Sequence, residues 1–233
     1  MIRWAASGLL ACATLVVAAM GVAEEAGTPH ARLLSVSNRA PPRFAPRLSA
    51  ETILANQPVD LVARLMDENV IVLQEVREEG ALRGAIVSSY VIFEKPVERV
   101  YMMLAQSARQ IEYRPELRSI RTIEWSSDGP IDEQRLKILF RRYVYRLKYH
   151  LAPEKRRIEW VLDERFDNDF ARVFGYWELY EMESGGTLGR SGTSIDVGPS
   201  IPAFLQDWVT RKNIPRAMKR VRRWVNSDGT YRP

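Results

Sequence analysis

The sequence predicts an α+β domain in which one long C-terminal helix packs against an antiparallel sheet. From Leu136 onward the chain is almost entirely strands, and it then closes with a Pro-bounded helical segment, residues 200–225. Because that segment has an apolar stripe, it must bury one face against the sheet, and a cleft between helix and sheet suits an apolar ligand. The stripe recurs at helical spacing in the second half of the segment: Ile214, Ala217, Met218, Val221, Trp224 and Val225.

Residues 1–23 have the pattern of a secretory signal peptide. Arg3 is their only charge, an Ala/Leu/Val-rich run follows, and small residues precede Glu24. We therefore expect a cleaved leader and an exported, periplasmic protein. An uncleaved N-terminal membrane anchor is the alternative, since about 20 apolar residues can span a bilayer. Residues 9–12 resemble a lipoprotein acylation site only loosely.

Composition narrows the chemistry of the mature chain. Of the 233 residues 46% are hydrophobic and 27% charged, which is ordinary for a globular domain. Cys12, the single cysteine, lies in the leader, so disulfides, thiolate catalysis and cysteine-ligated metals are not expected. Loss of Arg3 with the leader would lower the net charge from +5 to +4. We expect a monomer without cofactor or metal, no nucleic-acid partner, and an anionic membrane surface as the better partner for the basic residues.

The elements before the sheet follow from turn and cap signals. Residues 24–48 contain four prolines and no periodicity, which predicts a flexible linker. Residues 49–68 form a helical N-terminal extension, with Ser49 as N-cap and an interruption near Pro58. The folded domain, residues 69–227, opens with strands over 69–78 and 82–94 that form a hairpin.

Two short helices and six further strands follow. Pro96 suits the first turn of a helix, and a second short helix ends before Pro115. The apolar parity changes between Phe140 and Tyr143, which predicts a bulge or bend at residues 141–142. The six strands are expected over residues 119–125, 134–140, 143–152, 157–163, 172–182 and 187–197.

Four segments stand out together: residues 94–100, residues 113–120, the Gly175-Tyr176-Trp177 strand with the Gly-Gly hairpin after it, and residues 202–218. They resemble the START-like (SRPBCC) superfamily, the helix-grip group that includes polyketide cyclases and coenzyme Q-binding proteins. The resemblance covers about residues 82–225. It implies a curved antiparallel sheet of about seven strands wrapped around the last helix, two short helices after the first strand, and a hydrophobic cavity.

An aromatic set is the leading candidate for the cavity wall. Its members share the inferred inward parity of the strands or the apolar stripe of the helix, and tyrosine and tryptophan combine an apolar body with a polar tip. A filled core is the alternative interpretation for each residue taken singly. The candidates are Tyr143, Tyr145, Tyr149, Trp160, Trp177 and Leu179 from the strands, and Phe204, Trp208, Met218 and Val221 from the helix.

No catalytic residue is predicted. His30 lies in the linker and His150 on the outer side of its strand, so neither has convergent partners. The carboxylate pairs Glu178/Glu181 and Asp163/Glu164 fit solvated strand faces and turns. The chain also lacks a phosphate loop, a nucleophile elbow and zinc-ligand spacing.

The final helix also has a basic face. Pro215 is expected to break or kink the helix, which would make residues 204–212 a separate arm and a candidate lid over the cavity. The basic face is a candidate for contact with anionic lipid, and a solvated face is the alternative. Its candidates are Arg211, Lys212, Arg216, Lys219 and Arg220.

These observations predict a protein that binds, and possibly transports, a hydrophobic small molecule or lipid between sheet and helix. A cofactor-free cyclase or lyase using a cavity tyrosine with Glu or Arg is one alternative. It requires two ionisable side chains to converge inside the cavity. An envelope protein-interaction module is another, and a fully packed core would be its sign.

Overall fold

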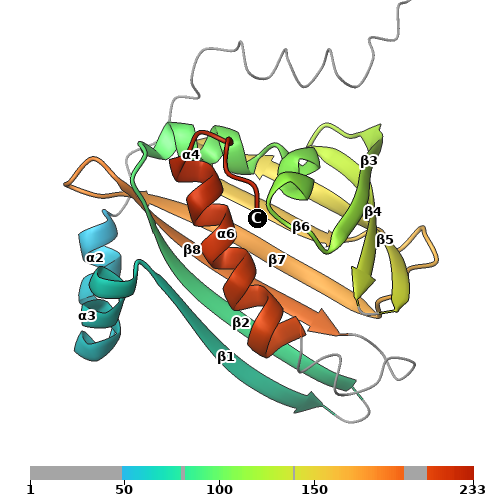
Figure 1. Ribbon diagram of the computed structural model, residues 1–233, viewed down its shortest axis with the longest axis horizontal. Coiled ribbons are helices and arrows are strands. Elements are labelled where there is room, and N and C mark those ends of the chain that lie inside the picture. Colours follow the sequence, from blue (N-terminus) through green and yellow to red (C-terminus); the bar gives the residue numbers. More distant parts are fainter. Residues whose placement is uncertain (1–48, 80–81, 139, 197–208) are drawn as a thin grey trace, which may run out of the picture.

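A single antiparallel sheet forms the frame of the computed structural model, which describes residues 49–79, 82–138, 140–196 and 209–233. Its eight strands are ordered β1-β2-β8-β7-β6-β5-β4-β3 (Figure 1). The predicted leader and linker, residues 1–48, and residues 197–208 lie outside the described residues. The strands are β1 (Val70–Glu79), β2 (Leu82–Phe93), β3 (Leu117–Trp125), β4 (Pro130–Ile138), β5 (Arg141–Ala152), β6 (Arg157–Leu162), β7 (Arg172–Glu181) and β8 (Thr187–Asp196).

The sheet has one strand more than the resemblance implies, because β1 pairs along the whole free edge of β2. The two short helices, α4 (Val97–Leu104) and the 3₁₀ helix η1 (Ser107–Glu112), consequently follow the second strand of the chain and not the first. Pro96 occupies the N-cap position of α4, immediately before the first turn in which the sequence places it.

The change of parity near residue 141 is a hairpin and not a bulge. β4 ends at Ile138 and β5 begins at Arg141, and these two residues are partners in the register. The chain therefore reverses between the two apolar runs, and Gln134 pairs with Tyr145 across the hairpin. A parity change alone does not distinguish a bulge from a tight turn, since both shift the side-chain alternation.

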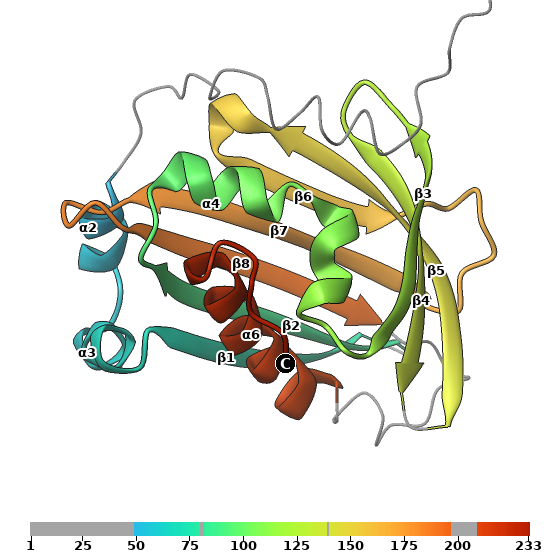
Figure 2. The same ribbon diagram turned by 45° about the horizontal axis from the view of Figure 1, so that its top comes forward.

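One face of the sheet curves around α6 (Ile214–Asn226), and α4 and η1 cover the same face beside it (Figure 2). The main hydrophobic core fills the space between them. Val91, Phe93 and Leu179 from the strands are fully buried there, as is Val225 from α6. This is the α+β helix-grip arrangement that the sequence predicts.

A second, smaller core lies on the other face of the sheet. The short helices α2 (Ala50–Ala55) and α3 (Val59–Glu68) pack there against outward-facing side chains such as Tyr90, Tyr180 and Leu188. Ser49 caps α2, since its side chain accepts from the backbone N–H of Thr52. No helix in the described part of the chain is both long and apolar enough to cross a bilayer.

The helix α6 (Ile214–Asn226) begins at the first residue of the apolar stripe, Ile214. A single π-helical turn, η3 (Val209–Asn213), leads into α6, and Pro215 occupies the first turn of α6. Proline is tolerated there because the N–H groups of a first turn have no intrahelical acceptor. Pro215 therefore starts the α-helix instead of kinking it, and most of the candidate lid arm lies outside the described residues.

Candidate ligand cavity

A cavity of about 140 Å³ lies between the concave face of the sheet and the first half of α6. Its wall is formed by strand residues that face the concave side of the sheet and by residues from successive turns of the apolar stripe of α6. On β8 the lining residues Thr193 and Ile195 have the opposite parity to Leu188, which belongs to the outer core. The lining from the central strands includes Leu136, Tyr145, Leu147, Tyr149, Ile158, Trp160 and Trp177, and α6 contributes Ile214, Ala217, Met218 and Val221.

Six of the ten predicted cavity residues line this cavity: Tyr145, Tyr149, Trp160, Trp177, Met218 and Val221. Two others are packed in the core. Tyr143 stacks on Phe170 at 5.5 Å between ring centroids, and Leu179 is fully buried in the main core. Phe204 and Trp208 lie outside the described residues.

A glycine on β7 sets the position of one aromatic wall. Gly175 is the cross-strand partner of Trp160, and the indole ring lies where a side chain of residue 175 would project. A Cβ atom at Gly175 would approach the Trp160 ring to 2.2 Å. Gly175 thus lets the ring lie flat on the sheet, and this keeps space open between the sheet and α6.

The cavity is not purely apolar, because a chain of hydrogen bonds crosses one end of it. Gln134 is fully buried; its amide oxygen accepts from the Tyr145 hydroxyl at 2.7 Å, and its nitrogen donates to Tyr149 at 3.1 Å. Gln110 also donates to the Tyr149 hydroxyl, at 3.0 Å. Arg114 completes the chain, with its Nη1 donating to Gln110 at 2.9 Å.

The sequence interpretation missed Arg114, Gln110 and Gln134. Gln134 has the inward parity of its strand, so its polar side chain on a buried face was the available signal. Gln110 and Arg114 carry no comparable signal, because only the packing of η1 against β4 and β5 brings them to the cavity.

Burial governs the protonation of the tyrosines. It raises the pKa of Tyr149 well above 10, with further increases from the charge of Asp132 and from Tyr145. Burial also raises the pKa of Tyr145, although the Arg114 guanidinium opposes this shift. Burial lowers the pKa of Arg114, but the neighbouring tyrosines and Glu116 outweigh it and leave this pKa above its ordinary value. At neutral pH both hydroxyls are therefore protonated and Arg114 is charged.

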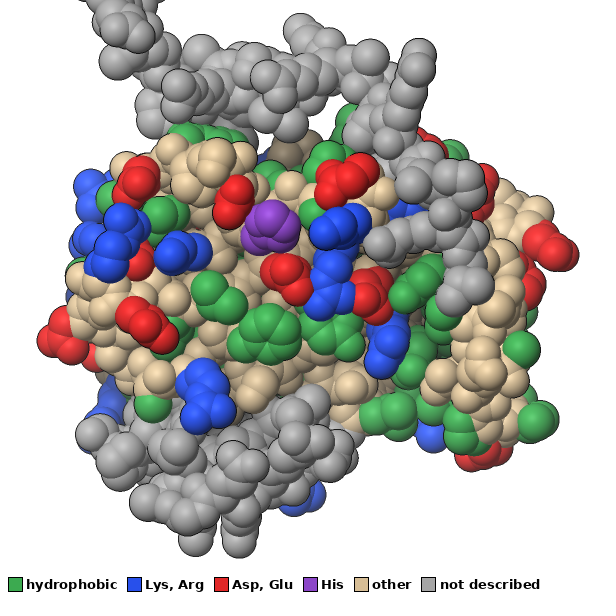
Figure 3. All heavy atoms as spheres, turned by 180° about the vertical axis from the view of Figure 1, so that it is seen from behind, with side chains coloured by type: hydrophobic (Ala, Val, Ile, Leu, Met, Phe, Trp, Pro, Cys, Tyr) green, Lys and Arg blue, Asp and Glu red, His purple; other side chains and the backbone are tan. Residues whose placement is uncertain are grey.

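The carboxylates and the histidine that the sequence offered as catalytic candidates lie next to oppositely charged residues or at the exposed surface. His150 is exposed, with its Nδ1 3.6 Å from Asp128. Glu178 forms an ion pair with Arg157, and Asp163 is paired with Arg165 at 2.9 Å. None of these side chains is among the residues that line the cavity. Seen from behind, the described surface shows hydrophobic side chains interspersed with charged ones (Figure 3).

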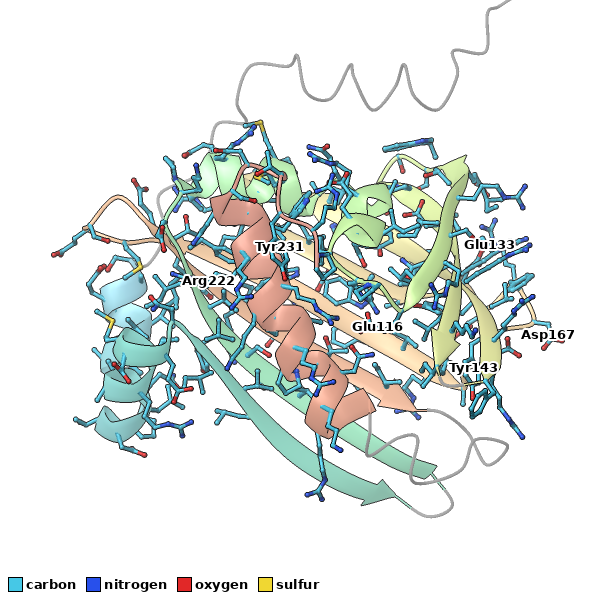
Figure 4. All side chains as sticks on the ribbon, in the orientation of Figure 1. Glu116, Glu133, Tyr143, Asp167, Arg222 and Tyr231 are labelled. Carbon is cyan, nitrogen blue, oxygen red and sulfur yellow. The ribbon has the colours of Figure 1, made fainter. Side chains whose placement is uncertain are left out.

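The basic face of α6 is not uniform. Arg220 donates to Glu116 at 2.8 Å, and Glu116 lies beside α6 (Figure 4), so Arg220 holds the helix to the β3 side and is not a free surface cation. Arg222, on the opposite side of the helix, donates to the Ile92 carbonyl at 2.8 Å. Four of the five predicted membrane-contact residues are exposed at the surface: Arg211, Lys212, Arg216 and Lys219.

No family model matches the chain, and no curated protein matches it. Solved structures do. TTHA0849 from Thermus thermophilus matches with a TM-score of 0.53 at 18% identity, over 62% of this chain and 99% of that one. A START superfamily protein from Mycobacterium smegmatis matches with a TM-score of 0.52 at 14% identity, over 61% and 97% of the two chains. At such identities the likeness concerns the fold. The chain has the START-like helix-grip fold.

Proposed function

We propose that the chain binds a hydrophobic small molecule between the sheet and the first half of α6. The observation that carries this proposal is the cavity itself, walled by Trp160, Trp177 and Val221 within an otherwise packed core. Burial of apolar ligand surface supplies the driving force, at about 25 cal/mol per Å² before ordering costs. A fully packed core would have favoured an interaction module instead.

The volume of the cavity limits what it accepts. An apolar cavity of roughly 150 Å³ holds a benzene-sized molecule, and drug-sized ligands occupy roughly 300–1,000 Å³. At about 140 Å³ this cavity fits a body the size of one ring. A longer lipid would fit only if α6 moved away from the sheet. Transport of such a lipid therefore requires that movement.

Native mass spectrometry of the protein, purified gently from its own envelope fraction, tests ligand binding directly. We expect a co-purifying small molecule. Replacing Ala217→Phe fills the cavity from α6 and should remove the adduct, whereas Arg216→Ala, on the exposed side of the same turn, should retain it. Wild-type protein that carries no adduct, and that binds no added hydrophobic probe, would contradict the proposal.

A cofactor-free enzyme is the second candidate, favoured by the convergence of Arg114 with Tyr145 and Tyr149 at one end of the cavity. Because its raised pKa keeps Tyr149 protonated at neutral pH, its hydroxyl serves such a reaction as a hydrogen-bond donor and not as a base. Incubation of the isolated ligand with wild-type protein and with Tyr149→Phe decides between the candidates. A change of ligand mass or structure that depends on Tyr149 supports catalysis, and an unchanged ligand supports binding alone.

We also propose peripheral contact with an anionic membrane through Arg211, Lys212, Arg216 and Lys219, without Arg220. Exposed cations near an anionic surface contribute about 1 kcal/mol each. The protein should co-sediment with vesicles of phosphatidylglycerol and should stay in the supernatant with vesicles of phosphatidylcholine. Lys219→Ala combined with Arg216→Ala should weaken retention, and an unchanged retention would contradict the proposal.

We propose, finally, that the protein acts outside the cytoplasm after removal of residues 1–23. The sequence pattern of those residues supports this. N-terminal sequencing of protein from the periplasmic fraction should begin at Glu24. Recovery of the intact leader in the membrane fraction would favour the anchored alternative.

A further inference from the structure

Arg114 is the single charged side chain among the described residues that line the cavity. It is half-buried, and its Nη1 donates to Gln110. Among the described residues no carboxylate lies within ion-pair distance of it, and the nearby Glu116 is paired with Arg220. A cation in an apolar wall costs free energy unless an anion or acceptor satisfies it.

The neighbouring hydroxyl of Tyr149 has unused donor capacity. It accepts hydrogen bonds from Gln110 and Gln134, and no acceptor for its own proton is found in the described part of the chain. The Tyr149 hydroxyl and the Arg114 guanidinium are hydrogen-bonded to the same residue, Gln110, and both line the cavity. They therefore lie at one end of it.

Most of the rest of the wall is apolar, and Thr193 and Asn213 are its further polar residues. Phe170 and Val173 lie on the strand side, with Met218 and Val221 opposite on α6. The cavity thus has a ring-sized apolar part and one polar end with a single positive charge. A ligand that satisfies both parts has an apolar body and one negatively charged group.

We propose that the ligand is a small amphipathic acid whose carboxylate is bound by Arg114, with the Tyr149 hydroxyl donating to the same group. This inference rests on the proposed function and specifies its ligand class. A guanidinium matches a carboxylate geometrically, since its parallel N–H groups bind two oxygens at once. One cation balances a monoanion, whereas a phosphate dianion would keep an uncompensated charge in an apolar site.

Benzoate and benzyl alcohol are the probes, because they share a ring that fits the cavity and differ in charge. Binding to the full chain is followed by NMR titration, with Trp160 and Trp177 as reporters in the wall. We expect benzoate to bind at least about 10-fold more tightly than benzyl alcohol, the size of a hydrogen bond to a charged group. Arg114→Gln should remove that preference, because benzoate then loses the hydrogen bonds from the guanidinium to its carboxylate.

Arg118→Gln is the matched control, since Arg118 is exposed on β3 and its replacement changes the net charge equally. It should preserve the preference for benzoate. Arg114→Lys keeps the charge but loses the bidentate geometry, and it should give an intermediate preference. It also tests the proposal if Arg114→Gln does not fold, as judged by thermal unfolding.

The outcomes separate the two proposals. Equal binding of benzoate and benzyl alcohol to wild type, or a benzoate preference that survives Arg114→Gln, overturns the role of Arg114 and leaves hydrophobic binding intact. Failure of both probes to bind wild-type protein overturns the proposed function, and with it the role of Arg114 in binding a carboxylate.

Discussion

The two halves of α6 carry the same apolar stripe but have different surroundings. In the first half Ala217 and Met218 face a cavity. In the second half Trp224 is fully buried, with its ring 5.0 Å from Tyr113 and its Nε1 donating to Glu112 at 2.9 Å. One helix thus borders a cavity at one end and forms part of a packed core at the other.

The second half is also fixed by polar contacts on both of its sides, in addition to the Arg220–Glu116 ion pair near the middle of the helix. Arg222 binds the Ile92 carbonyl and Glu94 on one side (Figure 4), and the guanidinium of Arg109 lies 4.8 Å from the Trp224 ring on the other. We infer that the second half anchors the helix, so that stability and ligand binding are divided along α6. Four substitutions test this division.

Trp224→Ala should have the largest effect on stability. It removes a fully buried indole, its contact with Tyr113 and its hydrogen bond to Glu112. We expect a loss of about 3–5 kcal/mol in the free energy of unfolding, measured by urea denaturation. A loss no greater than that caused by Met218→Ala would break the comparison between the two halves.

Glu112→Gln should cost about 2 kcal/mol at pH 7, because it weakens hydrogen bonds to a charged group. Burial raises the pKa of Glu112, but hydrogen bonds from Arg109 and Trp224 and the charge of Arg232 outweigh it and hold this pKa below 4.5. The folded state thus binds the proton less tightly than the unfolded chain. The stabilisation is complete above pH 4.5 and is lost as the pH falls through the lowered pKa.

The measurement is a series of urea denaturations of wild type and Glu112→Gln between about pH 7 and pH 3, a range that spans the titration of a carboxylate. The stability difference between the two proteins should shrink toward the acid end. A difference that stays constant over this range would show that Glu112 acts through packing and not through its charge.

Met218→Ala should cost only about 1 kcal/mol, since Met218 is half-buried and already borders a cavity. Its effect on ligand binding should be larger than its effect on stability, because the side chain forms part of the wall. Benzyl alcohol titration alongside urea denaturation measures both. A loss of stability similar to that of Trp224→Ala would mean that the first half is packed like the second.

Arg222→Met should have the smallest effect, about 0.5–1 kcal/mol, because Glu94 is largely exposed and water replaces part of the lost contacts. Arg216→Met is its control on the exposed face of the first half, where the change should stay within about 0.5 kcal/mol. Equal losses in the free energy of unfolding at the two positions would show that Arg222 does not help to hold the helix in place.

Apolar periodicity was enough to predict the α+β class, the order of the elements and the stripe of α6, because it directly reflects which face of an element is buried. It also identified Tyr145, Tyr149, Trp160 and Trp177 as inward-facing. Which inward residues border empty space became clear only from the packed structure: Tyr143 and Leu179 share that parity, yet both are packed.

Arg114 shows the same limit most clearly. Its place at the cavity depends on η1 packing against β4 and β5, and contacts between segments distant in sequence leave no periodic signal in either segment. Likewise, Arg216 and Arg220 are equivalent as basic residues in the sequence, but of these two Arg220 meets a carboxylate across the fold. Periodicity determines the face of an element, and the three-dimensional packing of the elements decides what that face meets.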